Sequence, residues 1–110
     1  MEGIYTLESL TEKKEKERGL LLYFSNDGCS VCRVLKPRVE EVLKDQFPRM
    51  SSFYIDIDKS PLLSGQHQVF TIPTILLYFD SKEYSRFSRN ISMHQLEDAI
   101  RKPYRMIFEE

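Results

Sequence analysis

Hydrophobic and polar positions along the chain predict three strands and a hairpin. Leu20–Phe24 is apolar at every position, which favours a central strand covered on both faces. Phe53–Ile57 alternates between apolar and polar residues, as a half-buried strand does. Thr74–Phe79 is a further apolar strand, and a turn at Asp80–Glu83 joins it to the alternating segment Tyr84–Arg89. These last two segments predict an antiparallel hairpin.

The longest predicted helix follows the first strand and ends near Gln46. Its apolar residues recur at helical spacing, at Val31, Leu35, Val39, Val42 and Leu43. Pro37 lies within this segment and lacks a backbone N–H. We therefore expect a helix of about four turns with a kink at Pro37.

Two shorter helices are predicted from their N-terminal signals. Ser9 and Glu12 have the spacing of a capping box, which predicts a surface helix over residues 9–18. Ser60 followed by Pro61 fits the cap and first position of a second helix that ends near Gln68.

The C-terminal helix carries the clearest signals. Ser92 and Gln95 form a second capping box, Ile91 and Leu96 are spaced as a hydrophobic staple, and Pro103 is predicted to end the helix. The remaining tail over residues 104–110 contains Met106, Ile107 and Phe108. It could pack on the domain or contact a partner, and packing is favoured.

This order of elements predicts the fold class. A strand, a helix and a second strand form a right-handed crossover with parallel strands, and the later hairpin adds antiparallel pairing. We expect an α/β fold with a mixed central sheet of four to five strands and helices on both faces. The 110 residues fit a single domain over residues 1–110, with a core over about residues 9–102.

Composition excludes several classes of function. Sixteen basic and seventeen acidic residues give a net charge of −1 without a basic cluster, which argues against nucleic-acid binding. No apolar run reaches the length that spans a bilayer, so no membrane association is expected. The first residues lack a secretory signal, and if Met1 is the natural start, a cytoplasmic protein is expected. Nothing in the sequence calls for a cofactor.

The only two cysteines form the motif Cys29-Ser30-Val31-Cys32 between the first strand and the long helix. At a helix N-terminus the free N–H groups and the helix dipole stabilise a thiolate. The pKa of Cys29 is therefore expected to fall below the usual value of about 8.5. Cys32 lies one turn further along the same face, where it can close a disulfide. One exposed nucleophile and one resolving thiol are what thiol–disulfide exchange requires.

Two other interpretations of the motif stay open. Two cysteines can form half of a zinc site, but zinc needs four ligands. The only histidines, His67 and His94, lack metal-ligand spacing and are expected at the surface, so no metal site is predicted. The pair could also be an inactive motif retained for packing. The position between a buried strand and a helix favours redox chemistry.

With these features the sequence resembles the thioredoxin superfamily over roughly residues 9–102. The Cys-x-x-Cys motif, Pro37, the strand ending in Asp at residues 54–58 and the segment Val69-Phe70-Thr71-Ile72-Pro73-Thr74 carry the resemblance. It implies that Pro73 is a cis-proline packed against the cysteines and that Ile72 hydrogen-bonds the backbone of a substrate. A trans-proline that only begins the strand is the alternative.

Five residues in and around the motif differ from the pattern usual in thioredoxins. Gly28 stands where Trp is usual, and Ser30 and Val31 replace Gly-Pro. Tyr23 and Tyr54 stand where the family has a buried Asp and its Lys partner. Tyr23 is a poor base at neutral pH, and its hydroxyl is expected to meet Tyr54 across the strands.

The resulting hypothesis is a cytosolic thiol–disulfide oxidoreductase that reduces protein disulfides. Cys29 attacks the substrate disulfide beside Ile72 and Pro73, and Cys32 resolves the mixed disulfide. Thioredoxin reductase or a low-molecular-weight thiol restores the dithiol. The rival hypothesis is an adaptor of the same fold that binds a partner protein, with cysteines that are idle or act as a redox sensor.

Overall fold

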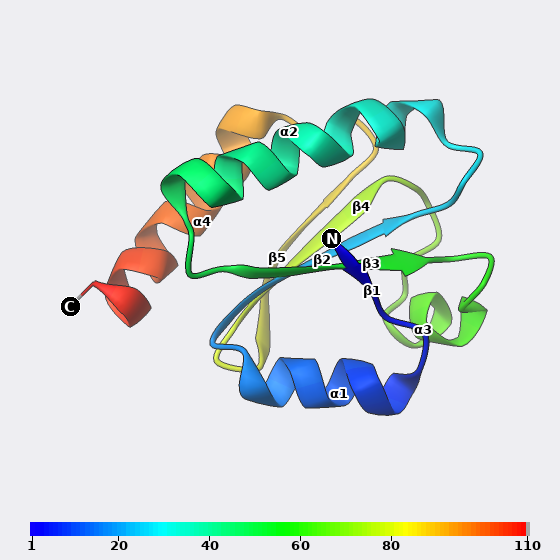
Figure 1. Ribbon diagram of the computed structural model, residues 1–110, viewed down its shortest axis with the longest axis horizontal. Coiled ribbons are helices and arrows are strands. Elements are labelled where there is room, and N and C mark those ends of the chain that lie inside the picture. Colours follow the sequence, from blue (N-terminus) through cyan, green and yellow to red (C-terminus); the bar gives the residue numbers. More distant parts are fainter. Residues whose placement is uncertain (110) are drawn as a thin grey trace.

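The computed structural model describes residues 1–109, which form a five-stranded sheet and four helices (Figure 1). In chain order the elements are β1 (Glu2–Gly3), α1 (Leu7–Lys16), β2 (Gly19–Ser25), α2 (Ser30–Gln46), β3 (Ser51–Asp56), α3 (Pro61–Gln66), β4 (Thr74–Phe79), β5 (Lys82–Ser88) and α4 (Met93–Phe108). The predicted strands, hairpin and helices are all present. The two-residue strand β1 was not predicted.

The sheet has the order β1-β3-β2-β4-β5, with β2 at its centre. Strand β2 pairs parallel to β3 and antiparallel to β4, so that Leu22 lies between Phe53 and Leu76. All seven residues of β2 are buried, as the uniformly apolar segment Leu20–Phe24 within it predicts. The predicted fold class, a mixed sheet with helices on both faces, is confirmed.

Two hydrophobic clusters cover the two faces of the sheet. Leu21 and Tyr23 of β2 point into the cluster that contains the buried residues of α2 and α4, whereas Leu20 and Leu22 point into the cluster with Leu10 of α1. This division follows from the two-residue period of a strand. In Figure 1, α2 and α4 accordingly lie on one side of the sheet and α1 and α3 on the other.

Strand β5 forms one edge of the sheet and is mostly exposed. Its hairpin turn is shorter than predicted, because Asp80 and Ser81 both adopt positive φ (50° and 72°) and pairing resumes at Lys82. A two-residue turn with positive φ at both positions matches the twist of the two strands it joins. Charged side chains along this edge, including Lys82 and Glu83, oppose pairing with another sheet.

The predicted capping box at Ser9 is wrong. Helix α1 begins at Leu7, and its cap is Thr6, whose Oγ1 accepts a hydrogen bond from the Ser9 backbone N–H at 3.1 Å. Thr6 has extended backbone angles (φ −127°, ψ 151°), as a cap residue requires. Ser9 is therefore the third residue of the helix.

Pro103 does not end the last helix, contrary to the prediction. It lies inside α4, although its ring removes the N–H that would donate to the carbonyl of Ala99. The residues beyond it pack on the domain. Tyr104 is buried, its ring meets Phe47 at 5.2 Å, and its hydroxyl accepts the Arg49 N–H at 3.0 Å. This packing holds the helical continuation in place.

The two histidines differ in environment. His94 is exposed on α4 as predicted, with Asp98 at 3.3 Å. His67 is half-buried, contrary to the prediction: its Nδ1 lies 2.8 Å from the Leu63 carbonyl and its Nε2 contacts Lys14 Nζ. Burial lowers the pKa of His67, with the Lys14 charge as a further cause. Within residues 1–109, no helix is both long and apolar enough to cross a membrane.

Candidate active site

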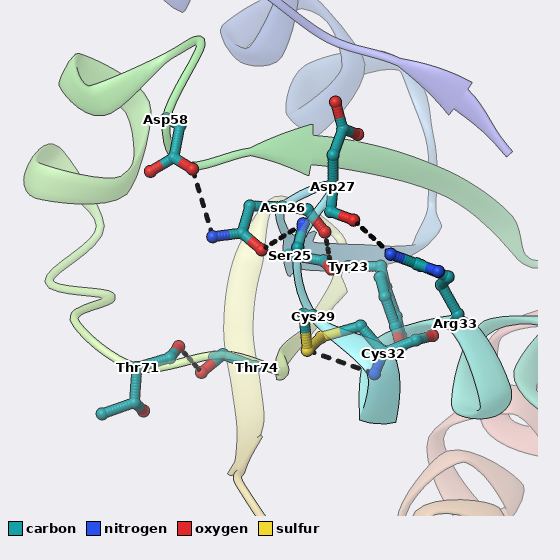
Figure 2. The surroundings of a disulfide bond; sticks show 11 residues. Tyr23, Ser25, Asn26, Asp27, Cys29, Cys32, Arg33, Asp58, Thr71 and Thr74 are labelled. Carbon is teal, nitrogen blue, oxygen red and sulfur yellow. Dashed lines mark hydrogen bonds between the residues drawn. A yellow bond between two sulfur atoms is a disulfide. The ribbon is translucent and has the colours of Figure 1, made fainter.

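Cys29 and Cys32 form a disulfide at the N-terminus of α2 (Figure 2). Cys29 is the cap residue, and Cys32 lies in the first turn, with 5.3 Å between their Cα atoms. Cys32 is buried, with 2% of its surface exposed, whereas Cys29 is only partly buried. The Cys32 backbone N–H donates to Cys29 Sγ at 3.2 Å. The more accessible sulfur therefore has a hydrogen-bond donor and the positive end of the helix beside it.

Asn26 shapes the loop that leads from β2 to the cysteines. Its Oδ1 accepts the Gly28 N–H at 3.1 Å, its backbone carbonyl accepts the Cys29 N–H, and its Nδ2 donates to Asp58 at 3.1 Å. A Cβ atom at Gly28 would meet only Asn26 Oδ1, at 3.8 Å. The backbone therefore leaves room for a Cβ at the position where the family usually has Trp.

The peptide bond between Ile72 and Pro73 is cis. Thr74 Oγ1 donates to the Thr71 carbonyl at 2.7 Å across this turn, and the Pro73 carbonyl accepts the Arg89 N–H at 2.9 Å. The backbone N–H and C=O of Ile72 have no hydrogen-bond partner within residues 1–109. These two groups are free to pair with an extended peptide, which is the family feature that the sequence suggested.

A hollow of about 530 Å³ joins the cysteine loop to the cis-proline turn. Its lining brings together six of the predicted site residues, Gly28, Cys29, Ser30, Val31, Ile72 and Pro73. Asn26, Arg89 and Asn90 also line it and were missed by sequence reasoning. Asn26 carried a local signal, since asparagine before Asp-Gly favours a turn. Arg89 and Asn90 carried none: Arg89 is the last residue of the predicted hairpin, and Asn90 lies between it and the last helix cap.

Tyr23 lies beneath the motif, outside this hollow. Its hydroxyl donates to the Cys32 carbonyl at 2.8 Å, so the predicted meeting of this hydroxyl with Tyr54 is wrong. The two tyrosine rings stack instead, with centroids 6.2 Å apart and planes at 24°. Burial, and secondarily the neighbouring Tyr54, raises the pKa of Tyr23 well above its usual value. Tyr23 therefore anchors the first turn of α2 and stays protonated.

The charged groups of Asp27 and Arg33, close to the motif in sequence, have partners other than the sulfur atoms. The Arg33 guanidinium donates to the Asp27 backbone carbonyl at 2.9 Å (Figure 2). The Asp27 carboxylate lies 3.7 Å from Lys59 Nζ. Cys32 lines a separate hollow of about 360 Å³ with Asp27, Arg33 and Tyr54 among its neighbours. Both cysteines are therefore adjacent to a hollow, each to a different one. Residues 1–109 contain no cluster of three or more potential metal ligands.

Comparison with known proteins identifies the family. The family model described as thioredoxin matches residues 6–102. The chain belongs to the thioredoxin family. It is 33% identical over 106 residues to the thioredoxin-like protein YdfQ of Bacillus subtilis, covering 96% of this chain and 94% of the relative. It is also 37% identical over 67 residues to a thioredoxin of Chlamydia trachomatis, covering 61% and 65% of the two chains.

Solved structures agree with this assignment. Thioredoxin 1 of Thermosipho africanus is 32% identical and superposes with a TM-score of 0.68, covering 74% of this chain and 89% of the other. Oxidised thioredoxin O2 of Arabidopsis thaliana shares the fold with a TM-score of 0.80 at 17% identity, covering 94% and 93%. Family membership and the Cys29–Cys32 pair make this thioredoxin-family protein a thiol–disulfide oxidoreductase, as the sequence predicted.

Proposed function

We propose that the protein reduces disulfides of other proteins through a Cys29–Cys32 dithiol cycle. The observation that supports this most directly is the asymmetry of the pair: a partly exposed Cys29 at the helix cap and a buried Cys32 one turn behind it. An incoming disulfide can therefore approach Cys29 more readily than Cys32. We therefore assign Cys29 as nucleophile and Cys32 as resolving residue.

The proposed cycle begins with both cysteines reduced. The Cys29 thiolate attacks one sulfur of the substrate disulfide, and the other substrate sulfur leaves as a thiolate that takes a proton from water. Cys32 then loses its proton and attacks Cys29 Sγ, which releases the first substrate sulfur as the second thiol. The substrate gains two electrons, and the protein is left with the Cys29–Cys32 bond.

Two backbone features support the binding step. The Cys32 N–H already donates to Cys29 Sγ, and the same donor can stabilise the Cys29 thiolate in the reduced protein. The unpaired N–H and C=O of Ile72, held by the cis bond to Pro73, can hydrogen-bond the extended backbone on one side of the substrate disulfide. Ile72 and Pro73 are therefore proposed as substrate-binding residues.

The reductant that completes the cycle is proposed to be a thioredoxin reductase or a low-molecular-weight thiol, and the proposed compartment is the cytoplasm. A reducing compartment keeps the resting protein as the dithiol. In that setting the protein contributes to thiol–disulfide balance by reducing proteins rather than by oxidising them.

Insulin reduction tests the proposal. With dithiothreitol as reductant, catalytic amounts of the wild-type protein are expected to accelerate precipitation of the insulin B chain. Cys29→Ser is expected to abolish this acceleration. Cys32→Ser is expected to accumulate a mixed disulfide on Cys29 that mass spectrometry detects, since nothing remains to resolve it.

Thr11→Ala is the control, because Thr11 is exposed on α1, lies outside both hollows beside the cysteines and makes no side-chain hydrogen bond within residues 1–109. It is expected to retain activity. Absence of insulin reduction by folded wild-type protein would contradict the proposal and favour an adaptor role. Brief labelling with limiting iodoacetamide gives a second check: label mainly on Cys32 would reverse the assignment of the two sulfurs.

A further inference from the structure

The hollow beside the disulfide continues along α2 as a second hollow. The two share Val31, Arg89 and Asn90. The second has a volume of about 550 Å³ and is lined by Val31, Val34, Leu35, Arg38, Arg89, Asn90, Ile91 and Ser92. These two hollows, here called the α2 groove, run from the disulfide between α2 and the segment that joins β5 to α4. A peptide that presents a disulfide to Cys29 would extend into this groove.

The floor of the α2 groove is apolar and open. Val31 and Val34 expose 60% and 66% of their surface, and Leu35 and Ile91 complete the apolar patch. On α2, residues 31, 34, 35 and 38 recur at helical spacing and so share one face. This patch suits one apolar side chain of a bound segment.

Both arginines of the groove have unpaired charges. Arg38 and Arg89 are exposed, and neither guanidinium has a hydrogen bond, ion pair or ring contact within residues 1–109. By contrast, Arg86 pairs with Glu83 at 2.7 Å, and Arg101 pairs with Asp98 at 2.7 Å. No acidic residue lines either hollow of the groove. The groove therefore has a net positive charge although the whole chain has a charge of −1.

The backbone fixes Arg89 next to the substrate-binding turn. Arg89 adopts φ 64°, in the left-handed region that residues other than glycine rarely occupy. Its N–H donates to the Pro73 carbonyl at 2.9 Å. This hydrogen bond holds the start of the Arg89 side chain at a constant position relative to Ile72 and Pro73.

We propose that the α2 groove selects substrates whose disulfide is flanked by carboxylate side chains, with an apolar residue between them and the disulfide. The proposal rests on the proposed function and adds the chemical class of the substrate. Arg38 and Arg89 would pair with the carboxylates, and the valines of α2 would contact the apolar residue. Exposed charge pairs of this kind act on encounter and on selection among partners more than on the chemical step.

Three synthetic peptides test the proposal. They share one intramolecular disulfide and one adjacent leucine, and their two flanking positions carry Glu, Gln or Lys. Reduction by the dithiol protein is followed under single-turnover conditions, and the second-order rate constant is measured. The expected order is Glu, then Gln, then Lys. Each charge pair is expected to contribute roughly two- to fivefold. The differences are expected to shrink at about 1 M salt, where charges are screened beyond about 3 Å.

Variants connect the preference to the two arginines. Arg38→Gln and Arg89→Gln are each expected to lower the rate with the Glu peptide, relative to the rate with the Gln peptide, by roughly two- to fivefold. The double variant is expected to lose the preference. Arg105→Gln is the matched control: Arg105 is exposed, lines neither hollow, and lies twelve residues beyond Met93, about 18 Å along the axis of α4.

Two results would overturn the proposal: equal rates for the three peptides, or a preference that persists in the double variant. Failure of the proposed function would give a different result: none of the three peptides, including the Gln peptide, would be reduced. The proposed substrate preference would then be refuted as well. All variants are compared with the wild type by thermal unfolding, so that loss of folding is not mistaken for loss of recognition.

Discussion

Replacing Tyr23 by phenylalanine removes a single hydroxyl beneath the redox motif. That hydroxyl is fully buried and donates to the Cys32 carbonyl at 2.8 Å. A buried hydrogen bond between neutral groups contributes about 0.5–1.5 kcal/mol. The carbonyl keeps the donor that α2 itself supplies four residues later, so the full penalty for an unpaired acceptor does not apply. We expect Tyr23→Phe to lower the free energy of unfolding by about 1 kcal/mol, or the Tm by about 5 °C.

Urea unfolding of the oxidised protein measures this loss. Tyr84→Phe is the matched control, because Tyr84 is 53% exposed and its hydroxyl has no hydrogen-bond partner within residues 1–109. A change within about 0.5 kcal/mol is expected there. An unchanged free energy in Tyr23→Phe would refute the anchoring role of the hydroxyl. A loss above about 3 kcal/mol would refute the argument that the Cys32 carbonyl retains a partner.

The same variant separates anchoring from proton transfer. Because burial keeps Tyr23 protonated, it cannot accept the proton that Cys32 loses during resolution. We expect resolution to be slow near neutral pH and to speed up as the pH rises towards 9, since burial disfavours the Cys32 thiolate. Stopped-flow reduction of a small protein disulfide from pH 6 to 9 is expected to give the same pH profile for wild type and Tyr23→Phe. A pH dependence that disappears in the variant would assign the proton transfer to Tyr23.

Three further variants test separate parts of the structure. Tyr23→Asp supplies a carboxylate near Cys32, so the rate of resolution at pH 7 is expected to rise, while the free energy of unfolding falls by at least about 3 kcal/mol. Equal stopped-flow rates for variant and wild type at pH 7 would show that Cys32 loses its proton by another route. Phe108→Ala is expected to lower the free energy of unfolding in urea by about 2 kcal/mol, because its half-buried ring packs on Tyr104 at 4.9 Å; no loss would contradict the packing of residues beyond Pro103. Burial lowers the pKa of His67 below 6.5, so the unfolded chain binds the proton more tightly and the stability of the wild type falls as the pH drops below 6.5. Urea unfolding at pH 5 and at pH 7.5 measures this: the loss of stability that His67 causes at pH 5 is expected in the wild type and not in His67→Gln.

The sequence predicted those elements whose local pattern and tertiary burial agree. Leu20–Phe24 is apolar throughout and lies in the centre of the sheet, and Thr74–Phe79 has the bounds that its pattern predicted. The helix after the cysteines ends at Gln46 as expected. The motif itself was accessible to sequence reasoning because its chemistry follows from its position at the junction of a strand and a helix.

What the sequence did not predict depends on contacts between distant residues. Strand β1 has two residues, and only its pairing with β3 makes it a strand. Helix α4 continues past Pro103 because Tyr104 packs against Phe47, and no local sequence pattern predicts this contact. Thr6 competes with Ser9 as a cap, and both fit the preference for small polar residues there. Arg89 lies at the site because its backbone N–H donates to the carbonyl of Pro73, 16 residues earlier in the chain.

The central position of β2 has a consequence for the order in which the molecule opens. Cys29 follows this fully buried strand by four residues, and β2 is paired on both sides. Its amides are expected to be the slowest in the chain to exchange with deuterium, whereas those of the exposed edge strand β5 exchange early. Arg89 directly follows that edge strand. On mild destabilisation, the wall of the groove would loosen while the segment that carries the sulfur atoms stays folded, so discrimination among substrates would decline before the capacity for disulfide exchange.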